Sequence, residues 1–113
     1  MSLDVYLINN QCPHCGRGEE VYSANITHNL NTMASEAGIY ETVWRPEENG
    51  ITKAKQLIDP LAKAIKEMED DPFRFKKFDS PNGWGLYVDF LPWLKKYMAA
   101  CIAEPEAQVI VSR

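Results

Sequence analysis

The chain has 113 residues, of which 45% are hydrophobic and 25% are charged, a composition typical of one globular domain over residues 1–113 and not of a disordered segment. Sixteen acidic residues oppose twelve basic residues, giving a net charge of −4, and no run of Lys or Arg is longer than two. Nucleic acid is therefore disfavoured as a partner, because proteins that bind it normally carry a basic stripe.

The two ends of the chain are predicted to form strands. Residues 3–8 alternate between apolar and other side chains in the period of a half-buried strand. Residues 19–23 (EEVYS) follow a turn and are expected to pair back on the first strand as a hairpin. Residues 108–112 (QVIVS) are rich in β-branched residues and predict a third strand. We place the first strand in the centre, between the second and the last.

The middle of the chain is predicted to be helical. One face of a first helix would carry the apolar residues that recur at helical spacing, namely Ile26, Leu30, Met33, Ala34 and Ala37. Gly38 is placed to end this helix in the left-handed conformation, and residues 39–46 add one more helical turn that Pro46 stops.

Three further helices are predicted after residue 50, and each of them contains a proline. Residues 50–68 form the next apolar face, with Pro60 expected to kink the helix or divide it in two. Asp71 and Pro72 resemble a cap followed by proline at the first helical position, which begins a short helix. A last helix follows Gly85 and is expected to kink at Pro92.

This order of elements predicts an α+β fold. We expect a small antiparallel or mixed sheet of about three strands, made of the N-terminal hairpin and the C-terminal strand, covered by three to four helices. The N-terminal segment MSLDVYLINN lacks the charged and apolar regions of a signal peptide, and no apolar run approaches the ~20 residues of a membrane span. Three cysteines, an odd number, make a poor disulfide framework. We therefore expect a cytoplasmic protein with no membrane partner.

The stretch QCPHCGRG (residues 11–18) carries the clearest chemical pattern. Its CPHC resembles the active-site tetrapeptide of disulfide oxidoreductases of the thioredoxin superfamily, but the glycines that follow do not favour the helix that such a site needs. Its Cys-Pro-X-Cys-Gly pattern also resembles a zinc-ribbon knuckle, in which proline fixes the turn and glycine permits a positive φ. A hairpin turn without metal is the third interpretation.

A structural zinc site needs four ligands, and the chain has no second CxxC. Cys12-x2-Cys15-x12-His28 matches three quarters of a C2H2 finger, but Thr32, Met33 and Ala34 stand where the second histidine belongs. The remaining metal hypothesis combines Cys12, Cys15, His28 and Cys101. We expect no cofactor apart from this candidate zinc ion.

Three polar marks outside this turn are candidates for binding a ligand or partner. His28 and Asn29 lie off the apolar stripe of the first predicted helix. Trp44 and Arg45 combine an aromatic ring and a cation, which form a recognition surface or else a buried ring beside a paired cation. The loop with Asn82 and Trp84 precedes the last helix and is either a tight turn or an anion site.

The marks ITHN, AGIY, WRPEE, NGWG and VSR, read in this order, resemble a small uncharacterised family of bacterial and phage-type proteins. The resemblance spans nearly the whole chain, and it implies only that these short motifs occur together in one family. It implies no catalytic residue.

The sequence holds no recognisable catalytic motif. We therefore expect a binding or interaction protein, with a protein or a small molecule as partner. A zinc-knuckle protein is the first alternative, and a small enzyme that uses His28 or a cysteine thiol is the second.

Overall fold

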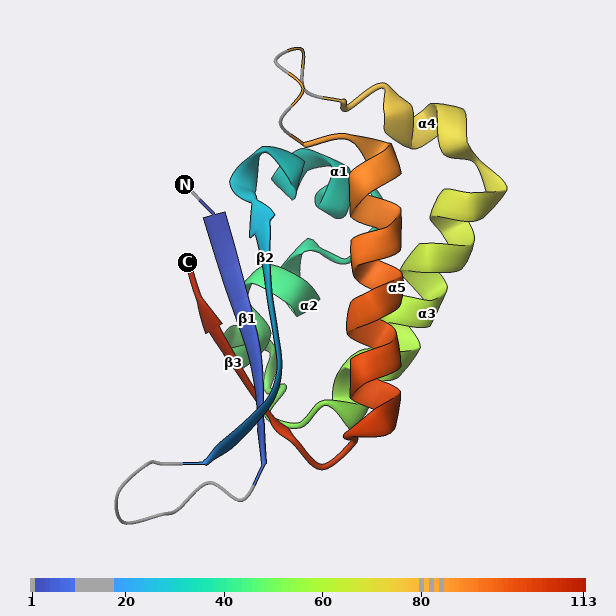
Figure 1. Cartoon of the computed structure of the whole chain (residues 1–113). Coiled ribbons are helices and arrows are strands. Elements are labelled where there is room, and N and C mark those ends of the chain that lie inside the picture. Colours follow the sequence, from blue (N-terminus) through green and yellow to red (C-terminus); the bar gives the residue numbers. More distant parts are fainter. Residues whose placement is uncertain (1, 10–17, 80, 82, 84) are drawn as a thin grey trace.

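The structure, a computed structural model, describes residues 2–9, 18–79, 81, 83 and 85–113 (Figure 1). The elements along the chain, with η for a short 3₁₀-helix, are β1 (Ser2–Asn9), β2 (Glu19–Thr27), η1 (His28–Leu30), α1 (Asn31–Glu36), α2 (Tyr40–Trp44), η2 (Pro46–Asn49), α3 (Lys55–Asp70), α4 (Pro72–Lys76), α5 (Tyr87–Ala103) and β3 (Gln108–Ser112).

The three strands form one antiparallel sheet in the order β2-β1-β3, so the first strand is central, as predicted. Alternate side chains of β1 are fully buried at Leu3, Val5 and Leu7, because successive residues of a strand point to opposite faces. Opposite them on the neighbouring strands lie apolar residues, such as Ala24 and Val111 across from Val5. One face of the sheet therefore belongs to the core.

The second strand is longer than the sequence predicts. It continues to Thr27, and Ile26 pairs with Leu3 instead of starting a helix. Ile26 fits both periods, since it stands four residues before Leu30 and two residues after Ala24. Pairing with β1 decides between them, because the strand buries Ile26 against the sheet's inner face. The first helical residues are therefore those of η1.

The helices lie on one side of the sheet, as an α+β fold requires, with α3 and α5 side by side (Figure 1). Both are continuous through a proline, so Pro60 and Pro92 do not divide them. Each helix buries large apolar side chains on both sides of its proline, for example Leu57 and Leu61 in α3. This packing offsets the backbone hydrogen bond that each proline removes.

Two predicted helix boundaries are confirmed. The carboxylate of Asp71 accepts a hydrogen bond from the backbone N–H of Arg74 at 3.3 Å and caps α4, which begins at Pro72. Gly38 follows α1 with φ +73°, a left-handed conformation that costs glycine little.

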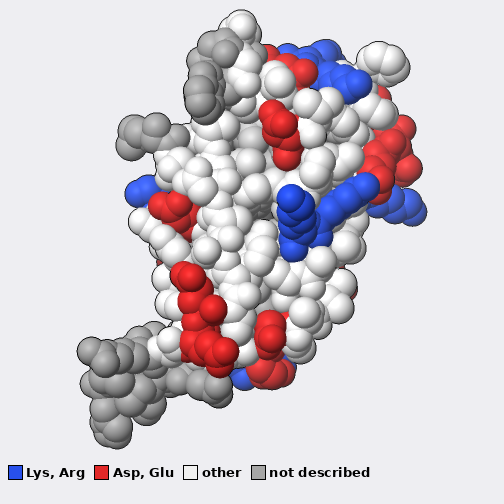
Figure 2. All heavy atoms as spheres, viewed as in Figure 1, with Lys and Arg blue, Asp and Glu red and all other residues white. Residues whose placement is uncertain are grey.

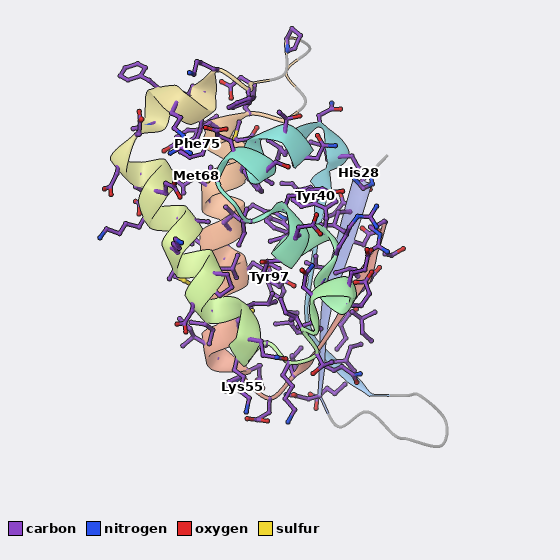
Figure 3. All side chains as sticks on the ribbon, turned by 180° about the vertical axis from the view of Figure 1, so that it is seen from behind. His28, Tyr40, Lys55, Met68, Phe75 and Tyr97 are labelled. Carbon is purple, nitrogen blue, oxygen red and sulfur yellow. The ribbon has the colours of Figure 1, made fainter. Side chains whose placement is uncertain are left out.

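The core lies between the helices and the sheet, where Met68, Phe75 and Tyr97 are all fully buried (Figure 3). The hydroxyl of Tyr87 ties α5 to α3, because it donates a hydrogen bond to the backbone oxygen of Met68 at 2.8 Å. Within the described ranges, no helix has the length and apolar character needed to cross a bilayer.

Candidate functional site

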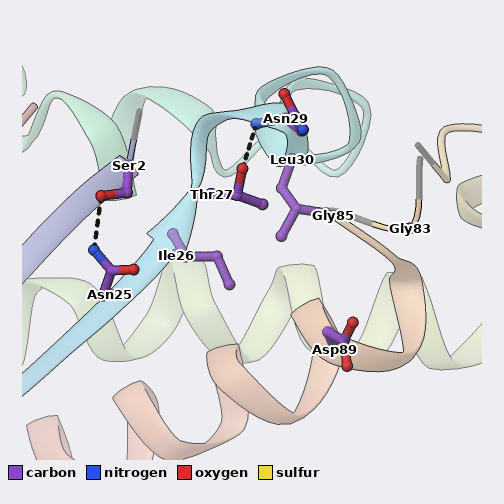
Figure 4. A pocket seen from close by; sticks show the side chains of 9 residues that line it. All are labelled: Ser2, Asn25, Ile26, Thr27, Asn29, Leu30, Gly83, Gly85 and Asp89. Atoms are coloured by element: carbon purple, nitrogen blue, oxygen red, sulfur yellow. Dashed lines mark hydrogen bonds between the residues drawn. The ribbon is translucent and has the colours of Figure 1, made fainter. Parts of the chain in front are cut away.

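A hollow of about 570 Å³ lies where the end of β2 and η1 meet the segment that leads into α5 (Figure 4). We call it the β2–α5 pocket. Its lining comes from four parts of the chain and consists of Ser2, Asn25, Ile26, Thr27, Asn29, Leu30, Gly83, Gly85 and Asp89.

The strand side of the pocket is held by side-chain hydrogen bonds. The amide of Asn25 donates to the Ser2 hydroxyl at 2.8 Å and to the Asp4 carboxylate at 2.6 Å. The backbone oxygen of Asn25 accepts a hydrogen bond from the indole of Trp93 in α5 at 3.1 Å. Asn25 therefore joins β1, β2 and α5 at the rim.

The turn from β2 into η1 is fixed by a cap. The hydroxyl of Thr27 accepts a hydrogen bond from the backbone N–H of Asn29 at 3.3 Å (Figure 4). Thr27 thereby satisfies a backbone donor at the start of η1. The cap places the side chains of Thr27 and Asn29 beside each other in the lining.

Gly85 brings the segment before α5 against this turn. A Cβ atom on Gly85 would lie 3.0 Å from the Cβ of Asn29 and 3.3 Å from Cγ2 of Thr27. Its φ of +104° is one that residues with a side chain rarely adopt. Glycine at this position therefore permits both the backbone conformation and the close approach that closes one side of the pocket.

Asp89 lies in the first turn of α5 and is the one charged side chain among the described residues of the lining. It is exposed, and its carboxylate makes no side-chain hydrogen bond or ion pair with another described residue. The pocket thus combines amide and hydroxyl groups with a single negative charge, above the buried side chains of Ile26 and Leu30.

His28 lies beside the pocket and is tied to Trp44. The indole N–H of Trp44 donates a hydrogen bond to Nδ1 of His28 at 3.0 Å, and His28 is half-buried. Nδ1 accepts this bond only when it carries no proton, so it is not free to act as a base or as a metal ligand.

The other residues predicted for binding, Trp44 and Arg45, do not lie in the pocket. Trp44 is 1% exposed and stacks on Tyr40, so the buried alternative holds and its ring offers no surface to a partner. Arg45 forms an ion pair with Glu48 at 2.6 Å and does not line the pocket. Of the residues predicted for binding, Asn29 lines the pocket and His28 lies next to it. Asn82 and Trp84 lie outside the described residues, as do Cys12 and Cys15.

Cys101 is buried in the last turns of α5, and desolvation raises the pKa of its thiol to about 12. These turns run toward the end of the fold opposite to η1, where His28 lies (Figures 1 and 3). The structure therefore does not bring Cys101 and His28 together. Among the described residues, no group of three or more His, Cys, Asp or Glu side chains is placed to hold a metal ion.

Acidic and basic side chains are interspersed on the face shown in Figure 2. Across the described residues, several acidic and basic side chains form ion pairs, such as Lys95 with Glu69 at 2.9 Å and Lys53 with Glu106 at 2.7 Å. These charges neutralise one another, whereas the charge of Asp89 has no such counterpart among the described residues.

Sequence reasoning missed Ser2, Asn25 and Asp89 as lining residues. Asp89 could have been identified from its position in the sequence, because it follows Gly85 of the NGWG motif by four residues, at the start of the last predicted helix. Ser2 and Asn25 join the site only through strand pairing, which brings Ser2 opposite Thr27.

The chain was compared with protein-family models, with curated proteins and with solved structures, and nothing in the three comparisons matches it.

Proposed function

We propose that the chain is a non-enzymatic binding protein and that the β2–α5 pocket receives its ligand. The observation that carries the proposal is the hollow itself, which is lined by polar residues from β1, β2, η1 and the start of α5 together with the apolar Ile26 and Leu30. Small-molecule sites commonly combine a concave apolar surface with a few placed polar groups.

The chemistry of the lining supports binding rather than catalysis. Its polar side chains are the amides of Asn25 and Asn29, the hydroxyls of Ser2 and Thr27, and the carboxylate of Asp89. Amides and hydroxyls recognise a ligand through hydrogen bonds without exchanging protons near neutral pH. The imidazole of His28, a group suited to proton transfer, is engaged by Trp44 beside the pocket.

The rim is also preorganised. Asn25 is held by Ser2 and Asp4, and Thr27 is held by its capping bond to Asn29. A ligand would therefore find these groups already ordered, which lowers the entropic cost of binding.

The test is a screen of the ¹⁵N-labelled protein by amide NMR against neutral, cationic and anionic fragments. We expect hits to shift the amide signals of residues 25–30 and 85–89, and to shift them less in Asp89→Phe, whose ring would cover the hollow. Asp59→Phe is the matched control, because Asp59 is exposed on α3 and lies outside the lining.

Fragments that shift no signal around the pocket would contradict the proposal. So would shifts that Asp89→Phe leaves as large as Asp59→Phe does.

A further inference from the structure

The sign of the charge at the β2–α5 pocket narrows the class of ligand, provided that the pocket is the binding site as proposed above. Among the described residues that line it there is no Lys, Arg or His, and the charge of Asp89 is negative. An anionic ligand would meet this charge without a partner of opposite sign on those residues, whereas a cationic ligand would pair with it.

The start of α5 strengthens this preference. The positive end of a helix dipole attracts anions, and this was the basis of the anion-site alternative. Here the backbone N–H of Tyr87, the first residue of α5, already donates to the carboxylate of Asp79 at 2.7 Å. Asp89 adds a second acidic group within the first turn. The anion-favouring end of α5 is therefore occupied by the chain's own carboxylates.

The remaining polar groups of the lining also suit a donor-rich ligand. The amide NH₂ of Asn25 already donates to Ser2 and Asp4, so its side chain has only the carbonyl oxygen left to offer. The Asp89 carboxylate accepts hydrogen bonds and donates none when ionised. A ligand with several N–H donors matches these acceptors.

The apolar residues of the pocket indicate the second chemical feature of the ligand, besides its charge. Ile26 is 8% exposed and Leu30 is fully buried, so the open aliphatic surface beneath the polar rim is small and belongs to Ile26. A compact apolar group placed there removes water from Ile26 and from itself. We propose that the β2–α5 pocket selects small organic cations, with an amidinium or ammonium group against Asp89 and a compact apolar part beside Ile26.

Three probes of nearly equal shape separate charge from shape, namely benzamidine (cation), benzamide (neutral) and benzoate (anion). Each is titrated into ¹⁵N-labelled protein at low salt, and Kd is obtained from the shifts of the amides of residues 25–30 and 85–89. We expect benzamidine to bind roughly 1.5-fold to fivefold more tightly than benzamide, the range of an exposed charge pair, and benzoate to bind most weakly.

Asp89→Asn removes the charge and keeps the shape. We expect it to weaken benzamidine to the level of benzamide while the Kd of benzamide stays within about twofold. Asp59→Asn removes the same charge elsewhere and should leave the order of the three probes unchanged. Raising the salt concentration should weaken benzamidine alone, because salt screens the charge pair.

Equal affinities for the three probes in the unchanged protein, or an advantage of benzamidine that survives Asp89→Asn, would overturn the inference. Both outcomes leave the proposed function standing, since the probes still bind the pocket. If none of the probes shifts these amides, the inference is also overturned, and the fragment screen with its Asp89→Phe variant then decides the proposed function by itself.

Discussion

The indole N–H of Trp44 donates a hydrogen bond to Nδ1 of His28 across 3.0 Å, joining α2 to the turn that borders the pocket. Trp44 is 1% exposed, so its donor is sheltered from water. The backbone oxygen of Trp44 in turn accepts from Arg113 at 2.8 Å, which brings the last residue of the chain to the same place. His28 is therefore a structural partner of a buried ring.

His28→Ala should lower the free energy of unfolding by about 1–3 kcal/mol, because it leaves the buried Trp44 donor without an acceptor. The measurement is urea unfolding of the variant and the unchanged protein. Trp44→Phe removes the donor. In the Trp44→Phe background, His28→Ala should therefore lower the free energy of unfolding by about 1 kcal/mol less than it does in the unchanged protein. Strictly additive effects in this double-mutant cycle would show that the bond contributes nothing.

Gly85→Ala should destabilise the fold by about 2–3 kcal/mol, because the new Cβ meets Asn29 while φ lies at +104°. Gly50→Ala is the matched control, with φ +72° and no atom within 4 Å of the added Cβ, and it should cost only about 1 kcal/mol. Thermal or urea unfolding checks the difference. If the two variants lose the same stability, the close approach of Gly85 to η1 has no energetic consequence.

Tyr97→Phe should stabilise the protein by about 1 kcal/mol, because the Tyr97 hydroxyl is buried without a hydrogen-bond partner in the described part of the structure. The ring keeps its stacking on Tyr22, whose centroid lies 5.9 Å away. Tyr87→Phe is the opposite case and should cost about 1 kcal/mol, because it removes the bond to Met68. A loss of stability in Tyr97→Phe would mean that its hydroxyl is satisfied in solution.

Stability should fall at alkaline pH, in part through Cys101. Burial raises the pKa of this thiol from 9.0 to about 12, and burial also raises that of Tyr97. The unfolded thiol ionises above pH 9 while the folded thiol stays protonated, so a contribution that is complete below pH 9 is lost between pH 9 and 12.

Urea midpoints from pH 8 to pH 10.5 measure this loss. The decline should be less steep in Cys101→Ala than in the unchanged protein, by up to about 1.4 kcal/mol per pH unit. Titratable groups that do not interact with Cys101 contribute equally to both curves and cancel in the difference, whereas Tyr22 and Tyr97, whose pKa values Cys101 helps to raise, cancel only in part. Parallel curves would show that the thiol titrates alike in the folded and unfolded states.

The strands at the two ends of the chain were predictable because the first alternates with a period of two and the last is rich in β-branched residues. Residues 108–112 were predicted to be a strand, and β3 spans Gln108–Ser112. The end of β2 was not predictable, since Ile26 satisfies the helical and the extended period equally and only its partner Leu3 decides. Of the two outcomes predicted at Pro60, division of the helix is wrong, because the proline's local effect was visible in the sequence whereas the packing that holds α3 together was not.

The candidate site was predictable only in part. Asn29 and the segment at Gly85 were marked by their residue types, and both border the pocket. Trp44 could be assigned either to the surface or to the core, because an aromatic ring near an arginine fits both. Ser2 and Asp89 belong to the site through the tertiary fold, which places residues far apart in sequence around one hollow.

The pairing of β1 with β3 has a consequence for biosynthesis. Asp4 lies opposite Ser112 and Ile8 lies opposite Gln108. About a hundred more residues must therefore be synthesised after β1 before its second neighbouring strand exists. At the usual rates of translation this delay is roughly 5–20 s, during which one edge of β1 stays open. Contacts so distant along the chain also slow folding, because loop closure must come first. An open edge beside an apolar face invites pairing with other chains, so the nascent protein should depend on chaperones more than its small size suggests.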